Sequence, residues 1–283
     1  MQSVSIIRSL TVSVVIAVLS SSAVLAKDVE SPTILRVVGS TTVEKSLLEP
    51  NREHIRAATD VELELKCKGT GAGLLKLANG LAEVSGSSEP LADAIKSANE
   101  SAKEEHDQTK LPNNLVYSEI GHDRIVIIVN AKNKAITKLS KQQIADIFTQ
   151  KIVNWKQVGG KDESITVFIS PVGSATRSLF QKIILDGAEF PSEEVHKGGI
   201  MMPVSSTARE VDNVAMISDS ISAVSESTVN VSVRKSEVRI VETPSIERPL
   251  GLITVGNPSA KVQKVINYLR SNERAKVVVS KNN

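Results

Sequence analysis

Aromatic residues and cysteines are scarce in this chain of 283 residues. Phenylalanine, tryptophan and tyrosine together make up 2% of the sequence, so few side chains are available to stack on nucleobases or sugar rings. Cys67 is the single cysteine, and one thiol cannot form an internal disulfide. The core alone must therefore stabilise the fold, which a chain of this length allows. Any ligand is expected to be small, polar and non-aromatic.

The chain also lacks a strong excess of charge of either sign. Its formal net charge is +2 at pH 7, whereas proteins that bind nucleic acids usually carry a basic stripe. We therefore expect no nucleic-acid partner. The histidines, at 54, 106, 122 and 196, lack the spacing that is typical of metal ligands. The sequence predicts neither a metal site nor a cofactor.

Residues 1–26 have the pattern of a secretory signal peptide. Arg8 precedes the apolar stretch 11–19, which is much shorter than the roughly 20 residues that a membrane span needs. Val24, Leu25 and Ala26 supply small or short side chains where signal peptidase cleaves. We expect cleavage after Ala26 and export of the mature chain to the periplasm. An uncleaved membrane anchor is the alternative.

Strand and helix patterns alternate along the mature chain, which predicts an α/β fold with parallel strands. Strands are expected at 34–38, 61–67, 124–129, 165–169 and 250–255, with a further strand starting at Val84. Helices are expected at 42–58, 74–78, 141–148, 179–185 and 260–269, and a charged surface helix within 93–110. Residues 192–206 are expected to form a loop, and the pattern of 208–217 fits either a helix or a strand.

Three clusters rich in Gly, Ser and Thr stand where a strand or loop is expected to run into a helix. They are Gly39–Thr42, Gly69–Gly73 and Gly173–Thr176. At such a junction, free backbone N–H groups lie at the positive end of a helix dipole, with hydroxyls beside them. One cluster alone is more often a helix cap or a tight turn. Three in one chain favour a pocket that holds an oxyanion by hydrogen bonds rather than by formal charge.

Several longer segments form a specific combination of motifs. They are IGHDRI at 120–125, LSKQQIADIF at 139–148, KIVNW at 151–155, VGG at 158–160 and GSATR at 173–177. GSTTV at 39–43 and the stretch from Arg248 to Pro258 extend the match. Together these segments resemble the phosphate-binding proteins of bacterial phosphate ABC importers. The resemblance covers most of the mature chain and is weakest at 190–249.

The resemblance implies a two-lobed type II periplasmic binding protein fold with the ligand cleft between the lobes. Residues 27–123 plus 225–283 would form lobe 1 and residues 124–224 lobe 2, with a hinge near 121–124 and 222–225. The function it implies is capture of inorganic phosphate or a related oxyanion for an ABC permease at the membrane. The ligand-binding residues it implies are Thr41, Thr42, Thr70, Ser88, Ser174, Ala175 and Thr176.

Two positions depart from the family pattern and bear on anion selectivity. The pattern has an aspartate where this chain has Ser88, and an arginine where it has Ser170. An ionised acceptor takes the proton that phosphate carries and disfavours sulfate, which has none. An arginine adds a charge-assisted contact. Glu89, Arg124 and Arg177 are the candidates to replace these charges.

Three classes of function are therefore compared. The first is a phosphate-binding protein with reduced or altered anion selectivity. The second is an exported sensor or interaction protein that keeps the fold. The third is an enzyme with Ser87, Ser88 or Ser174 as nucleophile. It is disfavoured because Ser88 and Ser174 lack a Gly-x-Ser-x-Gly elbow and no histidine stands in a matching loop. The sequence favours a binding protein without catalytic activity.

Overall fold

The computed structural model describes residues 33–191, 200–205 and 207–271. These residues belong to one compact unit. The expected signal peptide and its cleavage site lie outside the described residues. Within the described ranges, no helix is both long enough and apolar enough to cross a bilayer.

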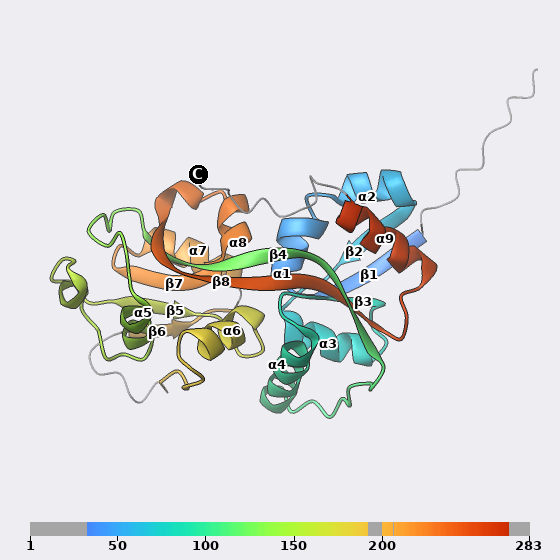
Figure 1. Ribbon diagram of the computed structural model, residues 1–283, viewed down its shortest axis with the longest axis horizontal. Helices are drawn as coiled ribbons and strands as arrows, with labels where there is room; N and C mark the ends of the chain where they lie inside the picture. Colours follow the sequence, from blue (N-terminus) through green and yellow to red (C-terminus); the bar gives the residue numbers. More distant parts are fainter. Residues whose placement is uncertain (1–32, 192–199, 206, 272–283) are drawn as a thin grey trace, which may run out of the picture. The chain divides into compact units, whose positions relative to one another are not determined.

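One mixed sheet of eight strands runs through the described residues, in the order β2-β1-β3-β8-β4-β7-β5-β6 (Figure 1). At one end of the sheet β1 is parallel to β2 and β3, and at the other end β5 is parallel to β6 and β7, as the sequence predicts. The contacts of the two central strands are antiparallel, which was not predicted. The strands are β1 (Thr33–Gly39), β2 (Val61–Leu65), β3 (Val84–Ser87), β4 (Leu115–Asn130), β5 (Thr166–Ile169), β6 (Ile200–Pro203), β7 (Ser220–Ser225) and β8 (Val238–Val255).

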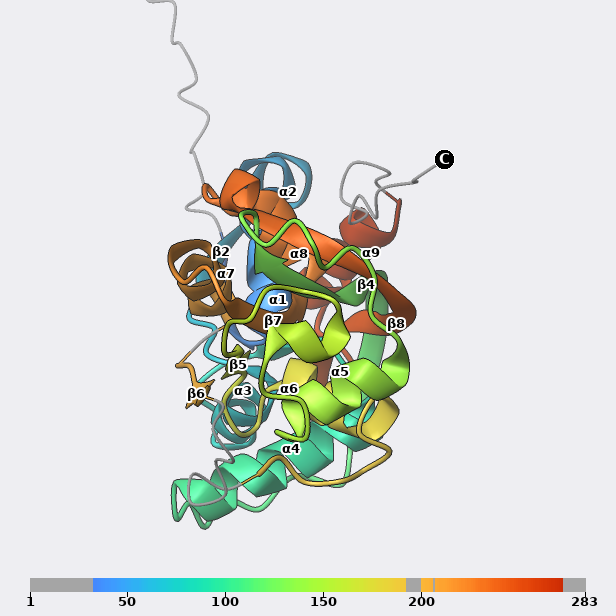
Figure 2. The same ribbon diagram turned by 90° about the vertical axis from the view of Figure 1, so that its left-hand side faces the viewer.

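Helices cover both faces of the sheet (Figures 1 and 2). Beside β1–β3, α2 and α9 lie on one face and α3 and α4 on the other; beside β5–β7, α7 and α8 lie opposite α5 and α6. The elements are α1 (Thr41–Val43), the π-helical η1 (Glu44–Leu48), α2 (Arg52–Thr59), α3 (Thr70–Ala78), α4 (Leu91–Glu104), α5 (Lys141–Phe148), the 3-10 helix η2 (Trp155–Val158), α6 (Ala175–Ile183), α7 (Thr207–Met216), α8 (Glu226–Val231), the 3-10 helix η4 (Lys235–Glu237) and α9 (Ala260–Ser271).

The hydrophobic core is divided between the two halves of the sheet. At one end, β1 packs against α2 and α9, and β8 also packs through Ile253 against α3 and α4. At the other end, the larger cluster contains the aromatic residues Phe148, Trp155 and Phe180, and a further cluster lies under α7. Trp155 is buried and donates its indole N–H to the Asp219 carbonyl at 2.8 Å, so it is a packing residue.

The long strands β4 and β8 contribute to both halves. Ile120 and Leu250 belong to the core under α9, whereas Ile125 and Ile246 belong to the core that contains Trp155. The pairing of β4 with β8 shifts in register between Glu119 and Gly121 and again between Ile125 and Ile127. Such irregularities increase the local twist of a strand pair. They lie on either side of residues 121–124, the part of β4 where the sequence predicts a hinge.

Three expectations about local structure need correction. Residues 200–203 are not loop: they form the edge strand β6, where Pro203 is tolerated because an edge strand needs fewer ladder donors. The helix expected over 42–58 is divided into α1, η1 and α2, with turn residues around Pro50. Cys67 lies beyond the end of β2 and is half-buried, and burial raises the pKa of its thiol to about 12.

Candidate anion-binding site

All three Gly-rich clusters stand at the N-terminus of a helix. Ser40 caps α1 by accepting a hydrogen bond from the Val43 N–H at 3.3 Å. Gly69 precedes α3, and Ser174 occupies the position before α6. The strand-to-helix junctions that the sequence predicts at the first and third clusters are thus confirmed, with β1 leading to α1 and β5 leading to α6.

Glycine is required where these loops approach other backbone segments. Gly39 has a φ of +105°, and a Cβ atom there would lie 2.2 Å from the Gly86 carbonyl oxygen. Gly173 has a φ of +72°, and a Cβ atom there would lie 1.9 Å from Ser101 Oγ. Both distances are far inside van der Waals contact, so a larger residue would push the loops apart.

Direct hydrogen bonds bring the loops together. The Gly69 N–H donates to the Gly39 carbonyl at 2.9 Å, and the Gly71 N–H donates to the Gly173 carbonyl at 3.2 Å. Ser40 Oγ donates to Ser88 Oγ at 3.0 Å. The loops after β1 and β3, the loop before α3 and the loop before α6 therefore meet, and the last of these comes from the other half of the sheet. We refer to them together as the four loops.

The residues predicted to bind the ligand lie on the four loops or in the first turns of the helices that follow them. Thr41 is half-buried, and the rest are buried, with exposures from 0% for Thr70 to 9% for Ser174. Thr70 Oγ1 has no hydrogen-bond partner among the residues that the structure describes. A buried hydroxyl without a hydrogen-bond partner destabilises the folded state, unless a group from outside the protein, such as a ligand, bonds to it. The buried residues are Thr42, Thr70, Ser88, Ser174, Ala175 and Thr176.

Arg248 of β8 lies among the predicted ligand residues, although it was not predicted as one of them. Its side chain is buried, and its guanidinium donates from Nη1 to Thr176 Oγ1 at 2.9 Å and from Nη2 to Thr42 Oγ1 at 3.1 Å. A buried cation therefore touches two of the predicted residues, which the sequence analysis did not foresee. The cause is the pairing of β4 with β8, which places Arg248 opposite Asp123.

Asp123 neutralises this arginine. Its Oδ2 atom accepts from Arg248 Nε at 3.0 Å and Nη2 at 2.8 Å, and also from Ser225 Oγ at 2.7 Å. Its Oδ1 atom accepts from the Ser227 N–H at 3.3 Å. A buried ion pair is tolerated when further hydrogen bonds complete both partners, as they do here.

Two of the candidates to replace the family charges have other partners. Arg124 forms a bidentate pair with Glu226, with distances of 2.7 and 2.6 Å. Arg177 donates to the Ser170 carbonyl at 3.1 Å and covers the Phe190 ring at 4.5 Å from its centroid. Neither forms a hydrogen bond to a hydroxyl of the four loops among the bonds of the described residues.

Glu89, the third candidate, lies in the loop after β3. It is completely buried, and its Oε2 atom accepts from Ser178 Oγ of α6 at 2.8 Å. Its Oε1 atom has no partner among the described residues. Burial raises the pKa of this carboxyl to about 7. Glu89 thus joins the two halves of the sheet and is able to exist in its protonated form near neutral pH.

A second buried carboxyl, Glu210 of α7, was missed by the sequence analysis. Ser170 Oγ donates to it at 3.0 Å and Ser222 Oγ at 3.3 Å. Burial raises the pKa of Glu210 well above its ordinary value. Ser170, at the position where the family pattern has an arginine, therefore contacts a carboxyl group. No sequence signal pointed to this residue, since 208–217 had no assigned element.

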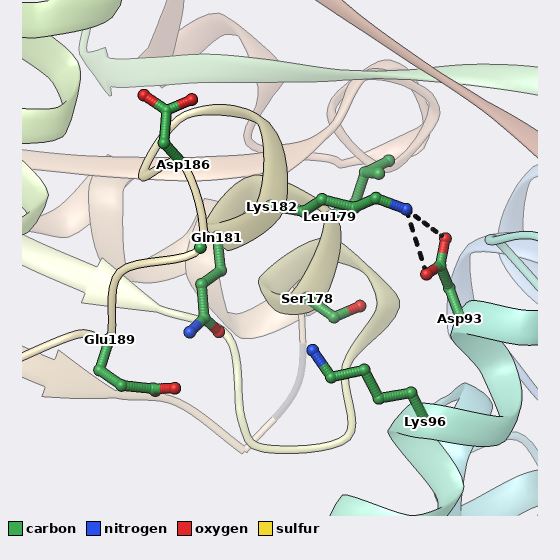
Figure 3. Close-up of a pocket in the computed structure, with 9 residues that line it drawn as sticks. Asp93, Lys96, Ser178, Leu179, Gln181, Lys182, Asp186 and Glu189 are labelled. Carbon is green, nitrogen blue, oxygen red and sulfur yellow. Dashed lines mark hydrogen bonds and ion pairs between the residues drawn. The ribbon is translucent and has the colours of Figure 1, made fainter.

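Three of the four loops border a cavity of about 1020 Å³, whose lining includes Thr41, Gly69, Gly173 and Ser174. The loop after β3 is not part of this lining. A second pocket of about 340 Å³ lies between α4 and α6 (Figure 3). There, Lys182 Nζ lies 3.1 Å from Asp93 Oδ2, an ion pair that crosses between the halves. Over the described ranges, no group of three or more His, Cys, Asp or Glu side chains is arranged to hold a metal ion.

The family model described as a PBP superfamily domain matches residues 26–273. The chain belongs to this family. It is 25% identical over 256 residues to the phosphate-binding protein PstS of Bacillus subtilis (strain 168), with 87% of this chain and 78% of the relative covered. The resemblance found in the sequence is thereby confirmed.

Solved structures share the fold of this chain. A putative phosphate ABC transporter substrate-binding protein with bound phosphate from Clostridium perfringens matches with a TM-score of 0.69 at 24% identity, covering 88% of this chain and 97% of the other. An ABC-type phosphate transport receptor from Vibrio cholerae matches with a TM-score of 0.59 at 20% identity, covering 87% and 97%. The predicted type II periplasmic binding protein fold is confirmed, although its strands form one continuous sheet.

Proposed function

We propose that this chain is an exported solute-binding protein that captures phosphate or a related oxyanion in the site formed by the four loops. One observation carries the proposal: hydroxyls from opposite halves of the sheet, those of Thr42 and Thr176, are held by the same buried arginine. The relatives named as phosphate-binding proteins give independent support.

The proposed binding mode uses donors from both lobes. The first turns of α3 and α6 supply backbone N–H groups, and Thr41, Thr42, Thr70, Ser88, Ser174 and Thr176 supply hydroxyls, whereas Ala175 contributes only its backbone. Each hydrogen bond to a charged acceptor contributes about 1.5–3 kcal/mol. Because ligand contacts come from both lobes, binding favours the closed state.

The lobes of the proposal are residues 27–123 plus 225–283 and residues 124–224. The hydrogen bonds from Ser178 of α6 to Ser97 of α4 and to Glu89 support the proposal that these lobes close on each other. The closed protein would then dock on an ABC permease. We infer no catalytic role, in keeping with the named transport functions of the relatives.

A sensor or interaction protein with altered anion selectivity is the second candidate. The contact between Ser170 and Glu210 favours it, because a carboxyl replaces positive charge close to Arg177 and the loop before α6. A carboxyl group offers no positive charge to an anion, so the affinity for any dianion is lower than with the arginine of the family pattern. Phosphate remains the first choice because Ser88 is able both to donate and to accept.

Calorimetric titration with phosphate and with sulfate tests the proposal. We expect phosphate to bind, and Thr41→Val or Ser174→Ala to weaken binding about 10- to 100-fold, the equivalent of one lost hydrogen bond to a charged group. Thr137→Val, at an exposed site in lobe 2, is the matched control and should bind as the wild type does. Equal affinity for both anions would support the second candidate, and heat from neither would refute anion capture.

N-terminal sequencing of the exported protein tests the localisation. The proposal requires a mature chain that begins at Lys27 and is recovered from the periplasmic fraction. A chain that retains residues 1–26 and sediments with membranes would instead support the uncleaved anchor.

A further inference from the structure

The chemistry of the Thr42 and Thr176 hydroxyls follows from their shared partner. A hydroxyl group has one proton to donate and two lone pairs to accept with, whereas a guanidinium only donates. Both oxygens must therefore accept from Arg248, at 3.1 and 2.9 Å. Each hydroxyl keeps its own proton, and no hydrogen bond in the described part of the chain uses either proton. Two donors from opposite halves are thus available to a third group.

The guanidinium that holds these hydroxyls is itself fixed. Its Nε and Nη2 atoms donate to Asp123 Oδ2, and Asp123 is held in turn by Ser225 Oγ and the Ser227 N–H. A guanidinium is planar and its donors have a rigid geometry. With one edge bound to Asp123, the remaining N–H groups point in fixed directions toward Thr42 and Thr176. Lysine has no such geometry, because its donors rotate about a single nitrogen.

We propose that Arg248 is the positioning residue of the anion site, which makes the hydroxyls of Thr42 and Thr176 donate to one shared anion. This inference rests on the proposed function. Arg248 acts through the two hydroxyls rather than by touching the anion, and Asp123 balances its charge. Arg248 therefore acts by orienting the two threonine hydroxyls as donors and by linking the lobes.

A double-mutant cycle tests the inference, with inorganic phosphate as the titrant. We expect Thr42→Val to weaken binding about 10- to 100-fold, and Arg248→Gln by at least as much, because the glutamine carbonyl is able to capture a hydroxyl proton. The double variant should bind no more weakly than Arg248→Gln alone, since residues that act through one another give non-additive effects. Arg248→Lys should recover part of the affinity by restoring one donor.

Arg234→Gln is the matched control. It breaks a bidentate pair with Glu237, and Arg234 lies outside the proposed hinge and bonds to neither threonine hydroxyl. We expect it to change the phosphate affinity by less than about threefold, as for a site outside the binding contacts. Urea denaturation establishes that each variant is folded. Arg248→Gln leaves Asp123 unpaired. If this variant is unfolded, two other variants take its place in the cycle with Thr42→Val: the double variant Asp123→Asn/Arg248→Gln and the single variant Arg248→Lys.

The outcomes separate this inference from the proposed function. Wild-type protein that binds neither phosphate nor sulfate refutes the proposed function, and this inference with it. Wild-type protein that binds phosphate, combined with additive effects of Arg248 and Thr42 substitutions, refutes the inference alone. Unchanged affinity in a folded Arg248 variant has the same consequence.

Discussion

Replacement of Glu89 by glutamine should make the stability of this protein less sensitive to pH. The wild-type carboxyl is completely buried, and burial raises its pKa from 4.5 to about 7. The hydroxyls of Ser178 and Ser97 oppose this shift, Asp93 of α4 adds to it, and Arg248 of β8 opposes it. Tyr117 of β4 also faces the carboxyl, and Glu89 contributes to raising the pKa of this phenol.

The size of the effect follows from the difference between the folded and unfolded states. Taking 4.5 for the unfolded chain, the shift is 7 − 4.5 = 2.5 units, which corresponds to about 3 kcal/mol at 1.36 kcal/mol per unit. Because the folded pKa is raised, the native state binds the proton more tightly. The contribution of this proton to the free energy of unfolding is therefore fully present below pH 4.5 and is lost as the pH rises to about 7.

Urea denaturation at a series of pH values between 4.5 and 8 measures this contribution. Glutamine does not titrate, so the free energy of unfolding of Glu89→Gln minus that of the wild type should rise by about 3 kcal/mol across this range. Other titrating groups cancel in the difference. Glu105→Gln, at an exposed site after α4, is the control and should differ from the wild type by less than about 0.5 kcal/mol. A difference for Glu89→Gln that is independent of pH would refute the argument.

Three further predictions concern loops and contacts around the site. Gly173→Ala should destabilise the protein by about 1–3 kcal/mol in thermal or urea unfolding, because of the positive φ and the contact with Ser101; an unchanged stability would contradict this. Thr70→Val should stabilise the ligand-free protein by about 1 kcal/mol, since its buried hydroxyl has no partner among the described residues, and should weaken phosphate binding in calorimetry; weaker stability would be the contrary result. Lys182→Ala should cost less than about 1 kcal/mol, because Lys182 is 63% exposed in its ion pair with Asp93; a larger loss would show that the α4–α6 contact is a major link between the lobes.

Local patterns were sufficient to predict much of the fold. The α9 helix buries Val262, Val265, Ile266 and Leu269, the residues whose spacing indicated an inward face. Ser140 caps α5 as predicted and forms a capping box with Gln143. In both cases the sequence signal and the contacts that it predicts involve residues within about two helical turns of each other. The same holds for the Gly-rich junctions, where the cluster and the helix it starts are contiguous.

The parts of the site that escaped prediction depend on the pairing of distant segments. Arg248 and Asp123 are 125 residues apart, and they meet only because of the register between β4 and β8. Glu210 likewise reaches Ser170 across 40 residues. Register is set by the packing of whole strands rather than by the residues near the site. A buried ion pair of this kind has no periodic sequence signal.

The position of Arg248 connects the proposed ligand contacts to the proposed hinge. Asp123 lies between the two register shifts of the β4–β8 pair, and it is bound by Ser225 at the end of β7. Rotation of one lobe about this point would carry Thr176 away from Arg248 while Thr42 stayed with the other lobe. The arginine is then able to satisfy only one hydroxyl, and the second would need another acceptor or donor. Closure therefore restores the hydrogen bond between Arg248 and Thr176 in addition to the hydrogen bonds made to the anion, so the energy of closing does not come from the anion alone.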